Sequence, residues 1–278
     1  MNVQSTNPIR DAYRRDGFYF PCRAMSEEQA AGYRARLEAF ERANGGPLKS
    51  AMRTDVHLLF TWADELVRND RILDAVEKVI GPNILCWITN FFIKEPGDGN
   101  FVSWHQDATY WGLEPHDQVL TAWLALSEAS VESGAMKFLP GSHLSGLHDH
   151  ADTFAKDNLL SRGQEIQLQV DEAQAADIVL KAGEFSLHHV LTAHGSHPNV
   201  TDDRRIGLAI RYIPTTVRQT KLRDTAVLVR GVDDYGHFDL INGPDADMSE
   251  QALATHRDAN ERLVKALLGD TDEKQLRD

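Results

Sequence analysis

The sequence contains little cysteine and no long apolar run. Its 278 residues include two cysteines, Cys22 and Cys86, and neither belongs to a Cys-x-x-Cys pair. This spacing predicts neither a disulfide framework nor a thiolate zinc site, and it suits a reducing environment. No apolar stretch is long enough to cross a membrane, and residues 1–15 lack the apolar segment of a signal peptide. We therefore expect a cytoplasmic protein without a membrane partner.

Positive charge is also scarce. The chain has 29 Lys and Arg against 42 Asp and Glu, which gives a formal net charge of -13 at pH 7. Because nucleic acids and anionic membranes attract proteins through clustered Lys and Arg, we expect neither as a partner. Internal repeats, low-complexity segments and Gly/Ser linkers are absent as well. We therefore expect a single domain over residues 1–278.

Helical patterns dominate the first part of the chain. Ser26 and Gln29 fit a capping box, which predicts that a helix begins there and extends to about residue 43. A second apolar periodicity runs over residues 63–80 and stops at a Gly-Pro pair. We predict that residues 1–83 form a helical layer against the rest of the domain.

The pattern changes to short β-strands at residue 84. Residues 84–94 are almost continuously apolar and rich in β-branched side chains, as in a buried strand. Further runs with strand-like composition are residues 119–126, 134–139, 165–170, 178–180, 184–191 and 205–213. Helix-length patterns do not separate most of them, which disfavours a parallel sheet and favours a jelly roll over residues 84–214. The expected fold is mainly β with flanking α-helices, and residues 215–278 add a strand and an outer helix.

A histidine and an aspartate two residues apart lie in a segment that we predict to be extended. They are His105 and Asp107, in the sequence Trp-His-Gln-Asp-Ala-Thr-Tyr-Trp. Residues i and i+2 of a strand project from the same face, so an imidazole nitrogen and a carboxylate oxygen can converge on one point. They would supply two of the three ligands of the facial triad found on non-haem iron. His-x-Asp by itself also fits an exposed polar pair, so the prediction depends on a third ligand.

Four histidines in one later segment offer that ligand: His188, His189, His194 and His197. Spacing alone does not choose among them. A polar turn at residues 198–203 predicts a hairpin that places His194 opposite Arg205 across a ladder. A guanidinium beside a metal ligand would suit a metal-chelating 2-oxo acid, whose far carboxylate it could hold through two hydrogen bonds. The other three histidines fit ordinary strand or turn positions, and Arg205 fits a surface charge equally well.

Four motifs follow one another between residues 84 and 214. They are His105-Gln106-Asp107, Leu139-Pro140-Gly141-Ser142-His143, His194-Gly195-Ser196 followed by Pro198-Asn199, and Arg205. In order and spacing they resemble the phytanoyl-CoA dioxygenase family of iron(II)- and 2-oxoglutarate-dependent oxygenases. The resemblance implies a double-stranded β-helix, the cupin-like form of the jelly roll.

The resemblance also implies a site and a reaction. The implied iron(II) ligands are His105, Asp107 and His194. Arg205 would pair with the distal carboxylate of 2-oxoglutarate, with Gln106 and Ser196 as secondary contacts to this cosubstrate. The implied reaction uses O2, releases succinate and CO2, and hydroxylates an unactivated C–H bond of a small metabolite. The presence of Asp107 favours hydroxylation, because related halogenases lack this carboxylate.

Substrate contacts have weaker signals. Residues near the triplet that could enclose a small molecule are Asn90, Phe101, Tyr110 and Trp111. Phe92 and Trp123 fit core packing better. Arg211 shares a strand face with Arg205, so it is a further candidate contact to the cosubstrate, and an external ion pair is the alternative. The long segment 141–163 is expected to form a lid or mouth loop.

Two other functions are compatible with the same residues. A zinc-dependent metallohydrolase could use the His/Asp/His set to activate water. A catalytically silent jelly-roll binding protein could keep the set as scaffold. The complete ligand set together with Arg205 favours the oxygenase.

Overall fold

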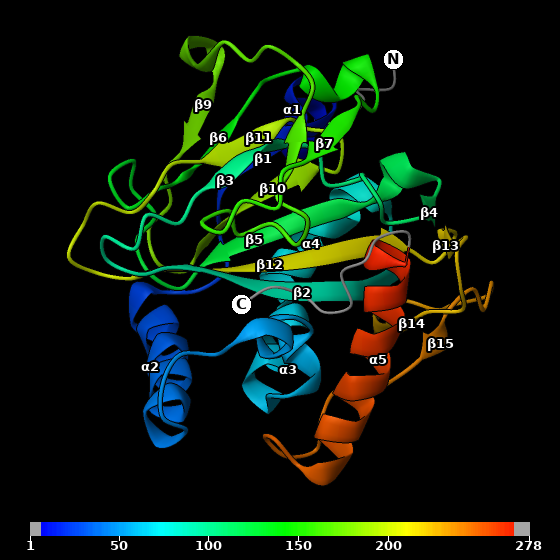
Figure 1. The fold of residues 1–278 in the computed structure, drawn as a ribbon. Helices are drawn as coiled ribbons and strands as arrows, with labels where there is room; N and C mark the ends of the chain where they lie inside the picture. Colours follow the sequence, from blue (N-terminus) through cyan, green and yellow to red (C-terminus); the bar gives the residue numbers. More distant parts are fainter. Residues whose placement is uncertain (1–6, 270–278) are drawn as a thin grey trace.

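Two β-sheets packed face to face form the centre of the molecule, and helices cover one of them (Figure 1). The computed structural model describes residues 7–269. The larger sheet has seven strands in the order β1-β10-β5-β12-β2-β14-β15, and the smaller sheet has four in the order β3-β11-β6-β9. This double-stranded β-helix with flanking α-helices confirms the predicted fold class.

The strands have the following bounds. The larger sheet contains β1 (Phe18–Arg23), β2 (Ile84–Lys94), β5 (Leu120–Ala125), β10 (Glu184–His189), β12 (Arg205–Pro214), β14 (Thr225–Arg230) and β15 (Asp239–Leu240). The smaller sheet contains β3 (Val102–His105), β6 (Met136–Phe138), β9 (Ala176–Ile178) and β11 (His194–Ser196). Two short pairs join β4 (Leu113–Glu114) to β13 (Arg218–Gln219) and β7 (His150–Asp152) to β8 (Gln164–Ile166). The strand predicted over residues 84–94 is therefore confirmed as β2.

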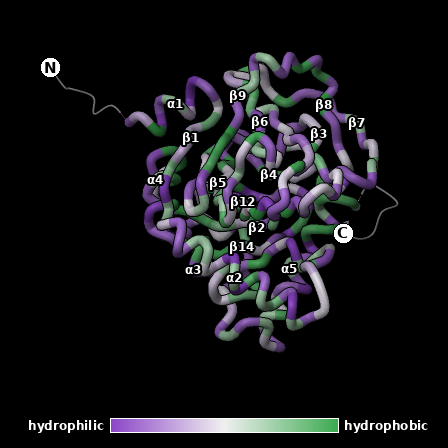
Figure 2. Tube along the Cα trace, turned by 90° about the vertical axis from the view of Figure 1, so that its left-hand side faces the viewer, coloured by the Kyte–Doolittle hydropathy of each residue, from purple (hydrophilic) through white to green (hydrophobic). Residues whose placement is uncertain are grey.

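Helices pack mainly on the outer face of the larger sheet. The α-helices of the described chain are α1 (Pro8–Asp16), α2 (Glu27–Ala43), α3 (Thr61–Val67), α4 (Asp70–Ile80) and α5 (Glu250–Leu268). Short 3-10 helices are η1 (Ser50–Arg53), η2 (Val56–Leu58), η3 (His116–Gln118), η4 (Ser142–Ser145) and η5 (Glu172–Gln174). In the turned view, α2, α3 and α5 lie on one side of the larger sheet and β3, β6 and β9 on the other (Figure 2). Over residues 7–269, no helix combines the length and the apolar character that crossing a membrane requires.

Side-chain capping explains where two of these helices begin. The capping box predicted at Ser26 and Gln29 is present, with each side chain accepting a hydrogen bond from the other residue's backbone N–H at 3.1 and 3.0 Å. The single helix predicted over residues 63–80 is wrong, because it divides into α3 and α4. Asn69 separates them, since its Oδ1 accepts from the backbone N–H of Arg71 at 3.0 Å and caps α4.

The N-terminal part is not purely helical, which corrects the predicted helical layer over residues 1–83. Strand β1 pairs with β10 at one edge of the larger sheet. Its sequence includes Pro21, which has no backbone N–H to donate to a ladder. Proline is tolerated on edge strands, where one side of the strand needs no partner. The proline therefore weakened the strand pattern without preventing the strand.

The predicted hairpin between His194 and Arg205 is also wrong. β11 pairs with β3 and β6 in the smaller sheet, whereas β12 pairs with β2 and β5 in the larger one. The connecting turn crosses between the sheets and is held by Asn199, whose Nδ2 donates to the carbonyls of Lys94 and Asp203 at 3.1 and 2.7 Å. His194 and Arg205 therefore belong to opposite sheets and line the same cavity between them.

Alternation along the larger sheet separates its two faces. Leu124 and Leu208 belong to the apolar core shared with the helices. The intervening positions face the smaller sheet, as Trp123 and Ala209 do in the core between the sheets. Polar side chains at such inward positions line a buried cavity between the sheets.

Candidate metal centre and anion site

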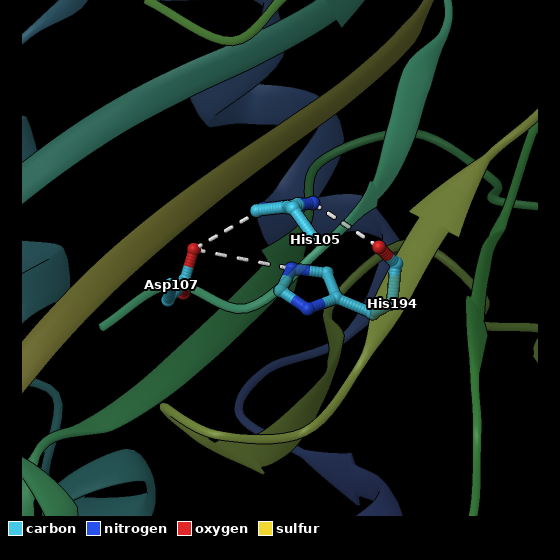
Figure 3. A group of neighbouring side chains, drawn as sticks. All are labelled: His105, Asp107 and His194. Carbon is cyan, nitrogen blue, oxygen red and sulfur yellow. Dashed lines mark hydrogen bonds and ion pairs between the residues drawn. The ribbon is translucent and has the colours of Figure 1, made fainter. Parts of the chain in front are cut away.

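Three side chains, two from the smaller sheet and one from the turn after β3, converge on one point (Figure 3). His105 ends β3 and pairs with His194 directly across the antiparallel ladder to β11, which brings the ring centroids to 4.1 Å. Asp107 follows two residues after His105, as the spacing predicted. Its Oδ1 lies 3.4 Å from Nε2 of His105 and 4.0 Å from Nε2 of His194. One ligand atom from each residue thus falls within 4.8 Å of the others.

Backbone carbonyls fix the orientation of both imidazoles. Nδ1 of His105 lies 2.9 Å from the carbonyl of Ser103, and Nδ1 of His194 lies 2.9 Å from that of Thr192. A carbonyl can only accept, so Nδ1 of each ring carries a proton, and Nε2 of each ring faces Asp107. This second contact of each ring is the usual way in which proteins orient metal-binding histidines.

The carboxylate of Asp107 is oriented in the same manner. Its Oδ2 accepts from Thr121 Oγ1 at 3.2 Å and lies 3.6 Å from Nε2 of His188. Burial by itself raises the pKa of this carboxyl group, but the facing side chains of His105 and His188 outweigh it and hold the pKa well below the usual range. Burial lowers the pKa of His194 well below its usual value. The carboxylate is thus charged and this imidazole neutral, as metal binding requires.

The donor set fits a divalent metal of the iron type. Two imidazoles and one carboxylate, all buried, approach from one side and leave the opposite side to the cavity. This is the composition of the facial triad, in which the remaining positions accept exogenous ligands.

A cavity of about 400 Å³ extends from this centre between the sheets. Arg205 of β12 lines it and is only 1% exposed. Its guanidinium carbon lies 5.2 Å from the Trp123 ring, its closest polar contact is the Phe92 carbonyl at 3.5 Å, and its Nε has no hydrogen-bond partner. Burial lowers the pKa of Arg205 to about 10, which leaves it charged at neutral pH. Because no acidic side chain of the described chain forms an ion pair with it, the site suits an incoming anion.

A family model gives the identification. The model described as phytanoyl-CoA dioxygenase (PhyH) matches residues 13–207. The chain belongs to this family. The match includes His105, Asp107, His194 and Arg205, the residues that carried the resemblance in the sequence.

Individual relatives of the family differ in name and in extent of similarity. A "probable alpha-ketoglutarate-dependent hypophosphite dioxygenase" from Stutzerimonas stutzeri is 36% identical over 178 residues, which cover 62% of this chain and 60% of that protein. The human peroxisomal phytanoyl-CoA dioxygenase is 29% identical over 160 residues, which cover 56% of this chain and 47% of that protein. The matched part is thus less than two thirds of either relative. Among solved structures, the apo form of the non-heme monooxygenase ThoJ is 38% identical, with a TM-score of 0.83 over 93% of this chain and 97% of that one.

In this family member, a lysine that sequence reasoning missed lies beside Arg205. Lys94 ends β2 and is fully buried. Its Nζ donates to Ser196 Oγ at 2.6 Å and to the carbonyl of His197. Burial, together with the positive charge of Arg205, lowers the pKa of Lys94 to about 6. The signal in the sequence was a single lysine at the end of an otherwise apolar run. Its position beside Arg205 depends on the pairing register of β2 and β12, which residue spacing does not show.

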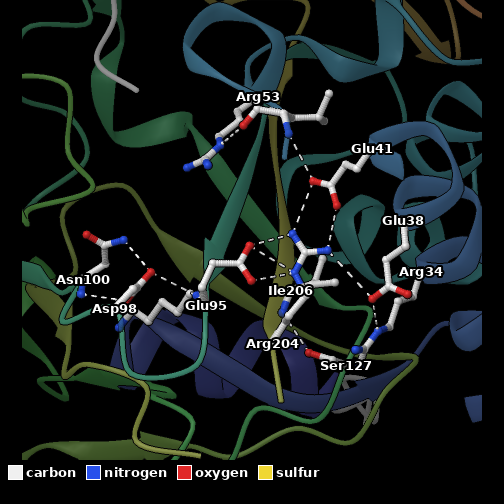
Figure 4. Close-up of polar contacts among 12 residues, drawn as sticks. Arg34, Glu38, Glu41, Arg53, Glu95, Asp98, Asn100, Ser127, Arg204 and Ile206 are labelled. Carbon is white, nitrogen blue, oxygen red and sulfur yellow. Dashed lines mark hydrogen bonds and ion pairs between the residues drawn. The ribbon is translucent and has the colours of Figure 1, made fainter. Parts of the chain in front are cut away.

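A salt-bridge network on the other face of β12 fixes the strand at Arg205 (Figure 4). The preceding residue, Arg204, donates to Glu41 of α2 at 2.7 Å and to Glu95 at 2.7 Å. Ile206 donates its backbone N–H to Ser127 Oγ at 2.8 Å. Consecutive strand residues point to opposite faces, so anchoring Arg204 on the helix side directs Arg205 into the cavity.

Gln106 and Ser196 have different placements, although both were expected to contact the cosubstrate. Ser196 lines the cavity. The side chain of Gln106 does not, because Nε2 donates to the carbonyls of Gly146 and Leu191 and Oε1 accepts from the backbone N–H of His148, each at 2.8 Å. We correct its expected role to that of a tether for the loop after η4.

The four candidate histidines are distributed differently from the expectation. His188 was expected to be an ordinary strand residue, yet it is buried and lines the metal-site cavity. His189 accepts from the backbone N–H of Leu191 and does not line that cavity. His197 is 60% exposed and pairs with Glu172 at 2.9 Å.

A second cavity, of about 890 Å³, shares Phe92, Asp107 and Arg211 with the first. Of the residues expected to contact substrate, Asn90 and Trp111 line it. Phe101 and Tyr110 line neither cavity, since Phe101 makes backbone contacts with residues 157–159 and the Tyr110 hydroxyl donates to Asp152 at 2.9 Å. Lining residues that sequence reasoning missed include Arg53, Leu160, Gln164, Leu263 and Leu267. They come from η1, the segment 141–163, β8 and α5, and no local pattern relates these elements to one another.

Proposed function

We propose that this chain is a 2-oxoglutarate-dependent non-haem iron dioxygenase that hydroxylates an unactivated C–H bond of a small metabolite. The observation that supports it best is that Arg205, a buried cation without an acidic partner, shares one cavity with His105, Asp107 and His194. The reaction would convert substrate, 2-oxoglutarate and O2 into hydroxylated product, succinate and CO2. One oxygen atom of O2 enters the product and the other enters succinate, so the atoms balance.

The three metal-binding side chains would hold iron(II), which when bound supplies the activation of O2 for C–H oxidation. The contribution of the chain itself is orientation. The carbonyls of Ser103 and Thr192 hold the two imidazoles, and Thr121 holds the far oxygen of the carboxylate. These contacts keep the three donor atoms on one side and the cavity free on the other.

Arg205 would hold the distal carboxylate of 2-oxoglutarate. Its guanidinium is fixed against the Trp123 ring and offers N–H groups that no acid of the described chain occupies. Lys94 adds a second donor beside it and is positioned by Ser196. The apolar walls around Phe92, Trp123 and Met136 would exclude water from the reacting atoms.

The names of relatives support the reaction class more than any substrate. The Stutzerimonas stutzeri relative is described as alpha-ketoglutarate-dependent, and ThoJ as a non-heme monooxygenase. The substrates in the names of these relatives cannot be assigned to this chain, because hypophosphite and a phytanoyl thioester differ greatly in size. The second cavity includes the apolar side chains of Trp111, Leu263 and Leu267, which hypophosphite has no hydrocarbon to contact. We therefore propose a larger organic substrate.

The cytoplasm is the proposed location. Cys22 and Cys86 are both free thiols, and Cys86 is buried in the core. Neither is used for a disulfide, which agrees with a reducing compartment.

The test is metal-dependent turnover of 2-oxoglutarate by the purified full chain. With iron(II), we expect O2 consumption and succinate release in equal amounts, stimulated further by substrate. Zinc-dependent hydrolytic activity that needs no O2 would replace the proposal with a metallohydrolase. Failure to bind either metal or 2-oxoglutarate would leave a silent binding protein.

A further inference from the structure

The second cavity contains a buried arginine that the metal centre and the cosubstrate site do not use. Arg211 of β12 is 6% exposed and lines both cavities, next to Asp107. It lies six residues from Arg205 on the same strand face, so the two Cα atoms are separated by about 20 Å at the usual rise per residue. Arg205 lines only the first cavity. The two arginines therefore lie at different ends of the two connected cavities.

The guanidinium of Arg211 is held in place by neutral groups. Nη1 donates to Asn90 Oδ1, and Asn90 is itself oriented because its Nδ2 donates to Thr54 Oγ1 at 2.8 Å. The rings of Phe92 and Trp111 lie 5.7 and 5.6 Å from the guanidinium carbon. Nε has no hydrogen-bond partner, and no acid of the described chain forms an ion pair with Arg211. The guanidinium is thus rigid and keeps donors available for a ligand.

The surrounding charges do not neutralise it. Asp107 is the only acid that lines the second cavity among the described residues, and it belongs to the metal-binding set. Asp55 is the other nearby acid, but burial raises its pKa to about 8, so it is largely uncharged at neutral pH. A buried cation that forms no ion pair with a described acid is costly, and an anionic ligand would offset that cost.

One part of the cavity wall is apolar, and the remainder is polar. Side chains that face it include Ile88, Trp111, Leu160, Leu263 and Leu267. A ligand that satisfies this surface carries hydrocarbon as well as charge. A planar guanidinium whose Nε has no hydrogen-bond partner among the described residues matches a carboxylate best.

We infer that the second cavity binds an amphipathic organic carboxylate, with its carboxylate on Arg211 and its hydrocarbon part along Trp111 and the leucines of α5. The inference rests on the proposed function, since it makes this cavity the substrate site of the dioxygenase. It assigns Arg211 to the substrate, whereas the sequence suggested the cosubstrate.

The experiment is calorimetric titration of the full chain loaded with Mn(II) and 2-oxoglutarate. The probes are straight-chain monocarboxylates from butanoate to decanoate, the matching primary amides, and octyl phosphate. We expect at least one carboxylate to bind about tenfold or more tightly than its amide, the scale of one charge-assisted contact. Arg211→Gln should remove this preference, and Arg211→Lys should retain part of it. Arg218→Gln, an exposed arginine paired with Glu114 at 3.1 Å, is the matched control and should behave as the parent.

The other possible outcomes contradict either the inference or the proposed function, as follows. Equal binding of carboxylate and amide, or no binding of any carboxylate while Mn(II) and 2-oxoglutarate bind normally, contradicts the inference and leaves the proposed function intact. Tighter binding of octyl phosphate than of every carboxylate contradicts the choice of head group. Loss of 2-oxoglutarate binding by the parent itself contradicts the proposed function instead. An unchanged Mn(II) and 2-oxoglutarate affinity in Arg211→Gln shows that the variant is folded.

Discussion

Lys94 and Arg205 lie directly opposite each other on β2 and β12, and both are buried, with Arg205 lining the metal-site cavity. Two like charges at directly opposed strand positions repel each other. Their repulsion is one reason why the pKa of Lys94 falls to about 6, after burial itself. A carboxylate bound beside them would relieve the repulsion, which is why we propose that this pair lies at one end of the cosubstrate site.

Replacing Arg205 tests the cosubstrate contact. Arg205→Gln removes the charge-assisted hydrogen bonds, and we expect the Kd of 2-oxoglutarate to rise roughly ten- to hundredfold. Metal affinity should stay within about twofold, because Arg205 touches none of the three metal-binding side chains in this account. Titration of Mn(II) into metal-free protein measures the metal affinity, and titration of 2-oxoglutarate into the Mn(II)-loaded protein measures the cosubstrate affinity. Equal dependence on 2-oxoglutarate in variant and parent would remove Arg205 from the site.

Lys94 makes cosubstrate binding depend on protons. At pH 7.5 a lysine with a pKa of about 6 is mostly neutral. A bound dianion favours the ammonium form and raises this pKa, so binding takes up roughly 0.5–1 proton. The affinity for 2-oxoglutarate should accordingly increase as the pH falls from 8 toward 6. Calorimetry in two buffers with different ionisation enthalpies counts the protons. In the Lys94→Met variant, 2-oxoglutarate binding should lose the proton uptake that Lys94 contributes. Identical binding enthalpies for the parent in both buffers would refute the coupling between cosubstrate binding and protonation of Lys94.

The histidines should separate into three classes of metal affinity. His194→Ala removes a proposed ligand and should abolish tight Mn(II) binding. His188→Ala removes only a contact to the far oxygen of Asp107, so we expect a decrease of about ten- to hundredfold. His189→Ala and His197→Ala should bind metal as the parent does, because neither lines the cavity. Tight metal binding by His194→Ala would mean that the wrong histidine was chosen.

Arg204 should matter for stability more than a typical surface arginine. Its side chain is 15% exposed and its partner Glu41 is 7% exposed, so Arg204→Met leaves a buried carboxylate without its cation. We expect a loss of about 3 kcal/mol in the free energy of unfolding. The control is Arg34→Met, whose partner Asp203 is 66% exposed and whose loss should cost below about 1 kcal/mol. Urea denaturation compares them, and similar losses for both variants would contradict the assigned role of the network.

Local patterns predicted the elements and the metal-binding set well. The capping box of α2 and the bounds of β2 depend on neighbouring residues, so the sequence was sufficient for them. His105 and Asp107 lie together because one residue separates them along the chain, although Asp107 lies in the turn after β3 and not on the predicted extended segment. Residues whose position depends on neighbours along the chain were therefore predictable.

Residues whose position depends on distant chain segments were not. The sheet that receives β11 or β12 is decided by pairing over long sequence separations, and the hairpin prediction failed for that reason. The same long-range register brings Lys94 beside Arg205 and places α5 over the second cavity. Tyr110 was expected at the substrate but donates to Asp152, a residue about forty positions away whose approach no local spacing indicates.

The most direct test of the central claim is a crystal structure of the protein with Mn(II) and 2-oxoglutarate. We predict one ion at coordination distance, about 2.0–2.3 Å, from Nε2 of His105, a carboxylate oxygen of Asp107 and Nε2 of His194. The distal carboxylate of 2-oxoglutarate should lie against Arg205. An ion bound elsewhere, or a cosubstrate whose distal carboxylate lies away from Arg205, would contradict the account.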